Sequence, residues 1–345
     1  MDKRSFIKFG FCAGLLNALQ ASGAAEIQQF DIGKARSGYI TRVAKIKRDG
    51  TLPIIDIESS YNPLEINLNS FTRAMDRAGI AQMCLSVDQP GSLVKEGQTW
   101  SQDSLVAYQK YPSHFIPTGN GGNHPAWTKD PDRFLADNEK YIVEQRYPLM
   151  GEFEFRHYPS PRQVKRGDWH RDVVIRIDGP EGHRLFAFAE KIGVPFQIHY
   201  EIEDVLLDPL ADMLAKYPKA KVIWCHLAQI RYQSRTTRYT RGMIAAWLDK
   251  YPNLYIDTAF GDSQSTYSPS GERHARYWSQ QDEWQQVINA NPYRFLAALD
   301  IGGDRMHQIE EWTRNLRSFI NTLPPSVREI VAYKAAWKLL FNEEG

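Results

Sequence analysis

The stretches Val194-Pro-Phe-Gln-Ile-His199 and Lys221-Val-Ile-Trp-Cys-His226 decide the fold class that we expect for this chain. Each is a short apolar run typical of a buried β-strand, each ends on a histidine, and each precedes a helix-like segment. Because strands that are each followed by a helix form a parallel sheet, both imidazoles are expected at the same end of that sheet. In a (β/α)8 barrel this end carries the active site.

The same alternation of strand-like and helix-like runs continues on both sides of these stretches, and it predicts a barrel. An open doubly wound sheet usually has fewer strands and a glycine-rich turn after the first, whereas that turn here reads Ser59-Ser-Tyr-Asn-Pro63. We therefore predict an α/β protein, a (β/α)8 TIM barrel with an added C-terminal helix, as a single domain over residues 26–345. The strand-like runs are 52–58, 81–88, 115–119, 149–155, 194–199, 221–226, 254–260 and 295–299, and the added helix is 327–341.

Residues 1–25 have the composition of an export signal. Lys3, Arg4 and Lys8 precede an apolar stretch that is too short to span a membrane, and small residues follow it. The run from Lys3 to Lys8 resembles a twin-arginine signal with lysine in place of the first arginine. An ordinary secretory (Sec) signal and an uncleaved amphipathic helix are the alternatives. We predict an exported, periplasmic protein.

Charge and composition indicate which partners the chain has. Its 345 residues include 42 Lys and Arg and 41 Asp and Glu, so it has no basic field for nucleic acid or anionic lipid. The hydrophobic share of 42% is that of an ordinary globular protein. Cys84 and Cys225 lie in apolar strands, where we expect them buried and unpaired. We expect a small-molecule substrate, no nucleic acid and no stable membrane insertion, and a homo-oligomer is left open.

Ionisable side chains stand at the ends of several predicted strands. Glu58 ends the first strand, Glu152 lies on the fourth, His199 and His226 end the fifth and sixth, and Asp300 follows the eighth. Carboxylates and imidazoles that converge on one cavity lose hydration and repel one another unless a cation or a proton compensates. Since neutral imidazole is a common ligand of divalent metals, the pattern indicates a metal or catalytic site at the barrel mouth.

Further polar residues lie on or after the same strands. Asp257, on the seventh strand, is expected to be a hydrogen-bonded structural acid. His124, on a loop over the barrel mouth, is a candidate for contacting a substrate. Further candidates follow strands that carry the site and could bind a carboxylate or phosphate through two hydrogen bonds: Arg156, His157, Arg231 and Tyr232. The alternative for His124 is that it only ties the loop, and for the other four that they are solvated.

Taken together, these pieces resemble the amidohydrolase superfamily, especially its amidohydrolase-2 and TatD-like branches. The resemblance covers residues 50–342 and rests on the order in which the pieces occur. Members of that superfamily usually carry His-x-His at the end of the first strand, where this chain has Glu58 and Ser60. The matching pieces are Ile54-Ile-Asp-Ile-Glu58, Gly151-Glu152, Pro195-Phe-Gln-Ile-His199, Ile223-Trp-Cys-His226 and Arg294-Phe-Leu-Ala-Ala-Leu-Asp300.

The resemblance implies one divalent metal ion, with zinc as the first expectation. His199 and His226, with Glu152 or Glu58, would hold the ion, and Asp300 would be the general base or a further ligand. The implied activity is hydrolysis of an amide, ester or lactone bond by metal-activated water. Three alternatives stay open: a decarboxylase of the same family, a glycoside hydrolase with its acids after strands four and seven, and a non-catalytic descendant that binds a ligand.

Overall fold

The computed structural model describes residues 29–63, 65–87, 101–122, 126–159, 161–229, 235–259 and 281–345. The predicted export signal lies outside the described residues, as do three of the substrate-contact candidates, His124, Arg231 and Tyr232. Export and a periplasmic location therefore stay predictions, which the mass of the mature protein would test.

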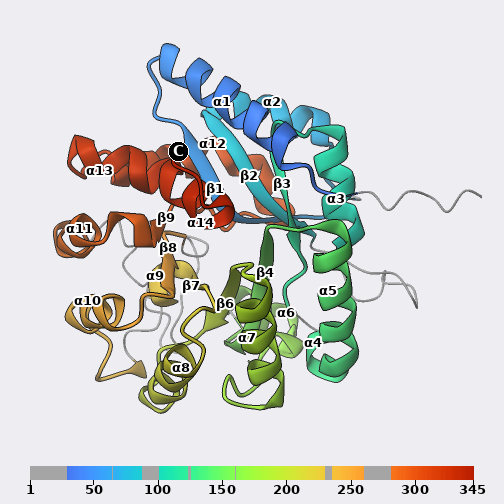
Figure 1. Ribbon diagram of the computed structural model, residues 1–345, viewed down its shortest axis with the longest axis vertical. Helices are drawn as coiled ribbons and strands as arrows, with labels where there is room; N and C mark the ends of the chain where they lie inside the picture. The colour runs from blue at the N-terminus through green and yellow to red at the C-terminus, as the bar shows by residue number, and fades with distance from the viewer. Residues whose placement is uncertain are drawn as a thin grey trace, which may run out of the picture.

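A ring of parallel strands forms the centre of the molecule (Figure 1), and neighbours in chain order pair with one another. The ring is closed by the chain around β9, which hydrogen-bonds to the first strand: Ile57 N donates to Ala297 O at 2.9 Å, and Asp300 N donates to Glu58 O at 3.0 Å. The predicted barrel is therefore confirmed. Its strands are β1 (Ile54–Tyr61), β2 (Ile80–Val87), β3 (Phe115–Gly119), β4 (Leu149–His157), β6 (Phe196–Tyr200), β7 (Val222–Trp224), β8 (Leu254–Asp257) and β9 (Phe295–Leu296).

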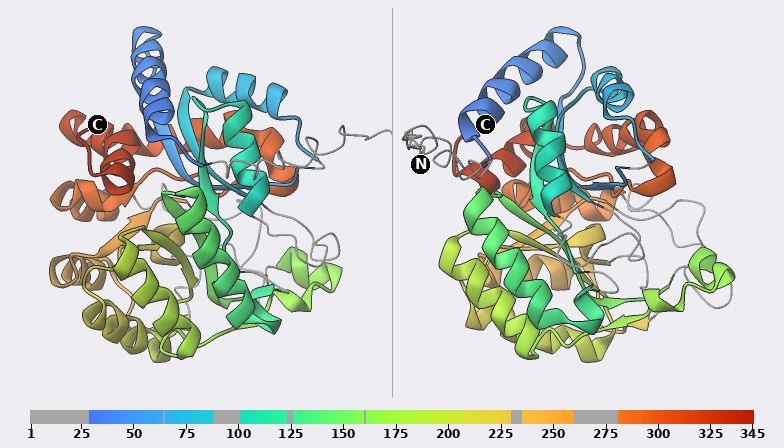
Figure 2. Two further views of the ribbon diagram at one scale, coloured as in Figure 1. Left: turned by 45° about the vertical axis from the view of Figure 1, so that its right-hand side comes forward. Right: turned by 90° about the vertical axis from the view of Figure 1, so that its right-hand side faces the viewer.

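Helices surround these strands, as all views show (Figures 1 and 2), and the core lies inside the barrel and between the barrel and the helices. The added C-terminal helix is also confirmed. It runs through α13 (Pro325–Glu329), a π-helical turn (Ile330–Lys334) and α14 (Ala335–Phe341). The helices between strands are α2 (Leu68–Ala78), α3 (Ser101–Lys110), α4 (Ala126–Lys129), α5 (Pro131–Gln145), α7 (Pro180–Ile192), α8 (Asp204–Lys216), α10 (Arg241–Lys250) and α11 (Gln281–Ala290), and α12 (Ile309–Ile320) follows the last strand.

Helix α1 (Ile32–Arg48) precedes the barrel and was not expected from the sequence. The side chain of Asp31 caps it by accepting a hydrogen bond from Gly33 N at 2.8 Å. The helix packs beside α14, where the rings of Tyr39 and Trp337 stack with centroids 4.2 Å apart. The two ends of the described chain therefore lie side by side.

A segment between β4 and α7 projects from the barrel, as both views of Figure 2 show. It contains α6 (Pro161–Arg166), a 3-10 turn (Trp169–Arg171) and the short strand β5 (Val173–Val174). Strand β5 pairs antiparallel with the end of β4, placing Arg156 opposite Val174. This pairing holds the inserted segment against the mouth of the barrel.

Cys84 and Cys225 are buried, as predicted, and both are free thiols. Within the described ranges, no helix has the length and apolar character needed to cross a membrane.

Candidate metal centre

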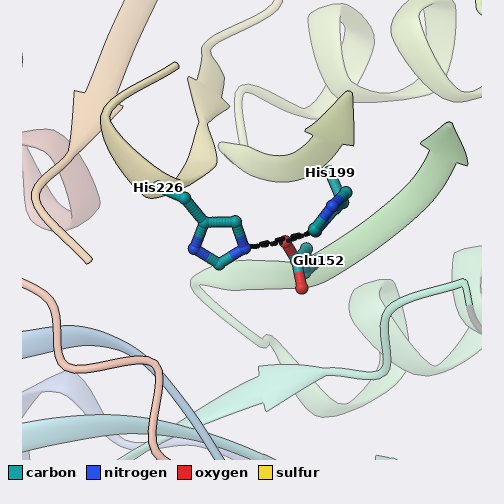
Figure 3. Close-up of side chains that lie close together, drawn as sticks. All are labelled: Glu152, His199 and His226. Carbon is teal, nitrogen blue, oxygen red and sulfur yellow. Dashed lines mark hydrogen bonds and ion pairs between the residues drawn. The ribbon is translucent and has the colours of Figure 1, made fainter. Parts of the chain in front are cut away.

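Glu152, His199 and His226 meet at one end of the barrel, and they come from β4, β6 and the turn after β7 (Figure 3). Glu152 Oε1 lies 2.8 Å from His199 Nδ1 and 2.8 Å from His226 Nε2. The two ring nitrogens are 3.2 Å apart, and the ring centroids are 4.9 Å apart. The strand-end pattern thus predicted correctly that imidazoles of neighbouring strands lie together beside a carboxylate.

An unusual backbone turn carries His226. Strand β7 was expected to reach this histidine, but it ends at Trp224, and residues 226–229 all have positive φ angles, between 54° and 59°. The left-handed conformation costs a residue other than glycine about 1–2 kcal/mol. Asp257 holds the turn, because its Oδ1 accepts hydrogen bonds from His226 N and Ala259 N, each at 2.9 Å. Asp257 therefore has the structural hydrogen bonds expected of it.

The two histidines stabilise the charged form of Glu152. Burial by itself would raise the pKa of this carboxyl group, but the nearby imidazoles of His226 and His199 hold it well below its usual range. The carboxylate side chain is 23% exposed, whereas each histidine side chain is 2% exposed. Glu152 is therefore the member of the trio that faces solvent.

Two other carboxyl groups near His226, those of Glu58 and Asp257, have raised pKa values, which favours their neutral form. Burial raises the pKa of Glu58 well above its usual value, and the negative charges of Asp257, Glu152 and Asp300 raise it further. Burial also raises the pKa of Asp257. The low polarity and the crowding of acids therefore favour a proton or another cation at this end of the barrel.

Glu58 and Asp300 lie beside the second ring nitrogen of His226, and a carboxylate oxygen of Glu58 is also within 4.8 Å of one of Glu152. Glu58 Oε2 and Asp300 Oδ2 are each 3.8 Å from His226 Nδ1. Asp300 has a φ of 47°, and its carboxylate is 3.4 Å from a guanidinium nitrogen of Arg305. Its side chain is 21% exposed, so this acid is open to solvent beside the buried imidazole.

The trio of Glu152, His199 and His226 fits a divalent cation. Two nitrogens and one oxygen are a usual donor set for zinc, and two ligands of a tetrahedral zinc ion are separated by about 3.4 Å. The three facing atoms lie 2.8, 2.8 and 3.2 Å apart, so small shifts would admit an ion. Among the residues that the structure describes, Glu58 and His199 do not belong to one three-ligand group: Glu58 groups with Glu152 and Cys225, and with His226 and Asp257.

Arg156 does not join this cluster. Its guanidinium donates to Asp172 Oδ1 at 2.6 Å and to Val173 O at 3.1 Å, and it stacks 3.9 Å from the ring of Tyr158. These contacts tie β4 to the inserted segment.

Three further residues lie beside the trio; His157 was a sequence candidate for contacting a substrate, whereas Glu201 and Arg171 were missed. Glu201 Oε1 lies 3.1 Å from His199 Nε2, and the ring of His157 is 4.5 Å from that of His199. Arg171, from the inserted segment, forms an ion pair with Glu154 on β4 and lies 3.3 Å from His157 Nε2. Strand alternation could have found Glu201, because it stands two positions after His199. Nothing in the sequence places Arg171.

Comparison with known proteins identifies the family. The amidohydrolase family matches residues 125–298, which is half of the chain. The chain belongs to the amidohydrolase family. It is therefore an enzyme of a metal-dependent family, and its matched region includes Glu152, His199 and His226. No curated protein matches the chain in sequence.

Solved structures share the fold of this amidohydrolase at low sequence identity. An uncharacterised TIM-barrel protein from Bordetella bronchiseptica is 17% identical with a TM-score of 0.54, over 84% of this chain and 98% of the other. 2,6-Dihydroxybenzoate decarboxylase from Rhizobium is 12% identical with a TM-score of 0.50, over 84% of this chain and 99% of the other. 4-Oxalomesaconate hydratase from Rhodopseudomonas palustris is 13% identical with a TM-score of 0.51, over 89% of this chain and 92% of the other.

Proposed function

We propose that this amidohydrolase is a hydrolase of an amide, ester or lactone bond, and that Glu152, His199 and His226 hold one divalent ion, zinc. The observation that carries the proposal is the convergence of three donor atoms within 3.2 Å of one another at the end of the barrel. A bound divalent ion supplies a Lewis acid that polarises a carbonyl group and lowers the pKa of water to about 7. Glu152 is a better carboxylate ligand than Glu58, because its oxygen is 2.8 Å from a nitrogen of each histidine, whereas Glu58 is 3.8 Å from His226 Nδ1.

Asp300 is the acid best placed to take a proton from the attacking water. Its carboxylate is partly exposed, and its Oδ2 is 3.8 Å from His226 Nδ1. Glu58 and Asp257 are less suited, because burial raises the pKa of each and favours the neutral form. The guanidinium of Arg305, 3.4 Å from Asp300, holds this carboxylate in place by an ion pair.

The proposal is tested by the metal content of the purified protein and of three alanine variants. We expect about one ion per chain in the unsubstituted protein, and little or none in His199→Ala and His226→Ala, because each removes a nitrogen ligand. His183→Ala is the matched control, since His183 lies on α7 and contacts Tyr217 rather than the trio. Metal retained in full by both ligand variants would contradict the proposed site.

Activity is measured on a panel of amides, esters and lactones, with release of carbon dioxide from carboxylated aromatic compounds recorded in parallel. Asp300→Asn should keep the ion and lose about 10²–10⁴-fold in hydrolysis, since general base catalysis contributes that much. Carbon dioxide release without hydrolysis would replace the proposed reaction by a decarboxylation at the same centre. Unchanged hydrolysis in Asp300→Asn would remove the proposed role of this residue.

A further inference from the structure

His199 lies between two carboxylates, and only one of them belongs to the proposed ligand set. Its Nδ1 is 2.8 Å from Glu152 Oε1, and its Nε2 is 3.1 Å from Glu201 Oε1. Glu201 follows β6 directly and is fully buried, with a side-chain exposure of 0%. A buried carboxylate is costly unless it accepts a hydrogen bond, so the contact with His199 Nε2 is important for Glu201.

The other contacts of Glu152 and Glu201 indicate which of these carboxylates accepts the N–H of His199. Glu201 Oε2 is buried and accepts no hydrogen bond in the described part of the chain. Glu152, by contrast, also lies 2.8 Å from His226 Nε2 and is partly open to solvent. A neutral imidazole has a single N–H group. Glu201 depends on that N–H more strongly than Glu152 does, which favours the proton on Nε2.

A proton on Nε2 leaves the lone pair of His199 on Nδ1. This nitrogen faces Glu152 Oε1 and lies 3.2 Å from His226 Nε2, so it points into the candidate metal centre, where a cation or a second proton must lie between it and the carboxylate. His226 has the opposite arrangement, because its Nε2 faces the centre and its Nδ1 faces Glu58 and Asp300. The two histidines would therefore bind an ion through different nitrogens.

We infer that Glu201 is the positioning residue of this site: it accepts the Nε2–H of His199 and so keeps Nδ1 turned toward the metal position. This inference rests on the metal site of the proposed function. A carboxylate that accepts the second N–H of a ligating histidine fixes the tautomer and the ring orientation and makes the ligand nitrogen more basic. Loss of such a partner typically weakens metal binding 10–100-fold.

The first test reads the tautomer in the metal-free protein. Long-range 1H–15N NMR spectra of histidine-labelled protein distinguish Nε2–H from Nδ1–H, and the His199 signals are assigned by their loss in His199→Ala. We expect the Nε2–H form in the unsubstituted protein, a largely retained Nε2–H form in Glu201→Gln, whose amide oxygen still accepts a hydrogen bond, and a mixture of tautomers in Glu201→Leu.

The second test is the affinity for zinc, measured by competition with a chelator. We expect Glu201→Leu to bind zinc about 10–100-fold more weakly and Glu201→Gln to fall between it and the unsubstituted protein. Gln82→Leu is the matched control: Gln82 is fully buried on β2 and donates to Ala35 O at 2.9 Å, far from the trio in sequence and contacts. The control should change neither the His199 signal nor the affinity.

The two readouts separate the possible failures. An Nδ1–H signal for His199 without an Nε2–H signal in the unsubstituted protein overturns the inference, and this holds even if Glu201→Leu does not fold. An unchanged tautomer together with unchanged affinity in a folded Glu201→Leu also overturns it. If the unsubstituted protein binds no zinc, the proposed function fails, whereas the tautomer spectra still decide whether Glu201 orients His199.

Discussion

At the scale of single residues, Gly121 leaves no room for a side chain against the backbone of the candidate site. A Cβ atom at this position would lie 1.9 Å from Glu152 O and 2.7 Å from Glu152 N. The loop after β3 therefore passes over β4 at the residue that faces both histidines. The next residue of the loop, Gly122, fixes this approach through its carbonyl oxygen, which accepts a hydrogen bond from Glu154 N at 2.9 Å.

We expect Gly121→Ala to lower the free energy of unfolding by about 1–3 kcal/mol, since overpacking against the backbone forces the loop or β4 to shift. The shift should also displace Glu152 and weaken zinc binding. Denaturant unfolding and chelator competition measure the two effects. In the control Gly242→Ala, the nearest atom would be 3.7 Å from the new Cβ, and stability should stay equal or rise. Equal stability and affinity in Gly121→Ala would show that the loop moves freely.

The residues of the trio could be predicted because their sequence signal is local. His199 and Glu152 lie on strands whose alternation and direction are readable, so their side chains could be assigned to the barrel mouth. His226 was found for a partly wrong reason, since it stands in a left-handed turn beyond its strand. That turn depends on Asp257, which is 31 positions away, and no local pattern encodes such a contact.

At the scale of elements, helix α5 ends on a residue that is poorly suited to its conformation. Arg146 is exposed and has φ 58° and ψ 43°, and its N–H donates to Ile142 O. Helices often end with this left-handed geometry, and glycine adopts it without the steric cost that a Cβ atom brings. The stop signal for this helix in the sequence is Pro148, two positions after Arg146, because proline cannot continue a helix.

We expect Arg146→Gly to raise the free energy of unfolding by about 0.5–1 kcal/mol, after the greater freedom of glycine in the unfolded chain is deducted. The midpoint of urea unfolding measures this change. Asn342→Gly is the matched control, because Asn342 ends α14 with a φ of 54° and asparagine tolerates this region better than arginine does. A smaller gain is therefore expected there. A loss of stability in Arg146→Gly would mean that contacts of the arginine outweigh its backbone strain.

At the scale of the whole molecule, the alternation of strands and helices was sufficient to predict the barrel, whereas α1 was not predictable. Its buried residues are only Ala35, Gly38, Tyr39 and Ile46, too few for a clear apolar stripe on 17 residues. Gly38 packs directly against Ser113, a residue far along the chain, and a Cβ atom at position 38 would lie 2.5 Å from Ser113 Cα. Helix α1 is therefore recognised by its tertiary contacts.

Ion pairs join α1 to the C-terminal helices, and they make this contact sensitive to acid. Lys47 on α1 pairs with Glu329, which also lies 3.1 Å from Lys334 Nζ. The hydrogen bond from Lys47, with smaller contributions from Tyr333 and Lys334, outweighs partial burial and lowers the pKa of Glu329 to about 2. Because this pKa is lowered on folding, the unfolded chain binds the proton more readily, and the stabilisation is lost as the pH falls.

We expect Glu329→Gln to lower the free energy of unfolding by about 0.2–1 kcal/mol at pH 7, the range of partly exposed ion pairs. The difference should narrow as the pH falls below the ordinary glutamate value of 4.5 and should vanish near pH 2. Urea unfolding of both proteins between pH 2 and pH 7 measures it. Lys47→Met should reproduce part of the effect, since Lys334 still faces Glu329. A difference that stays constant down to pH 2 would mean that Glu329 contributes through packing rather than charge.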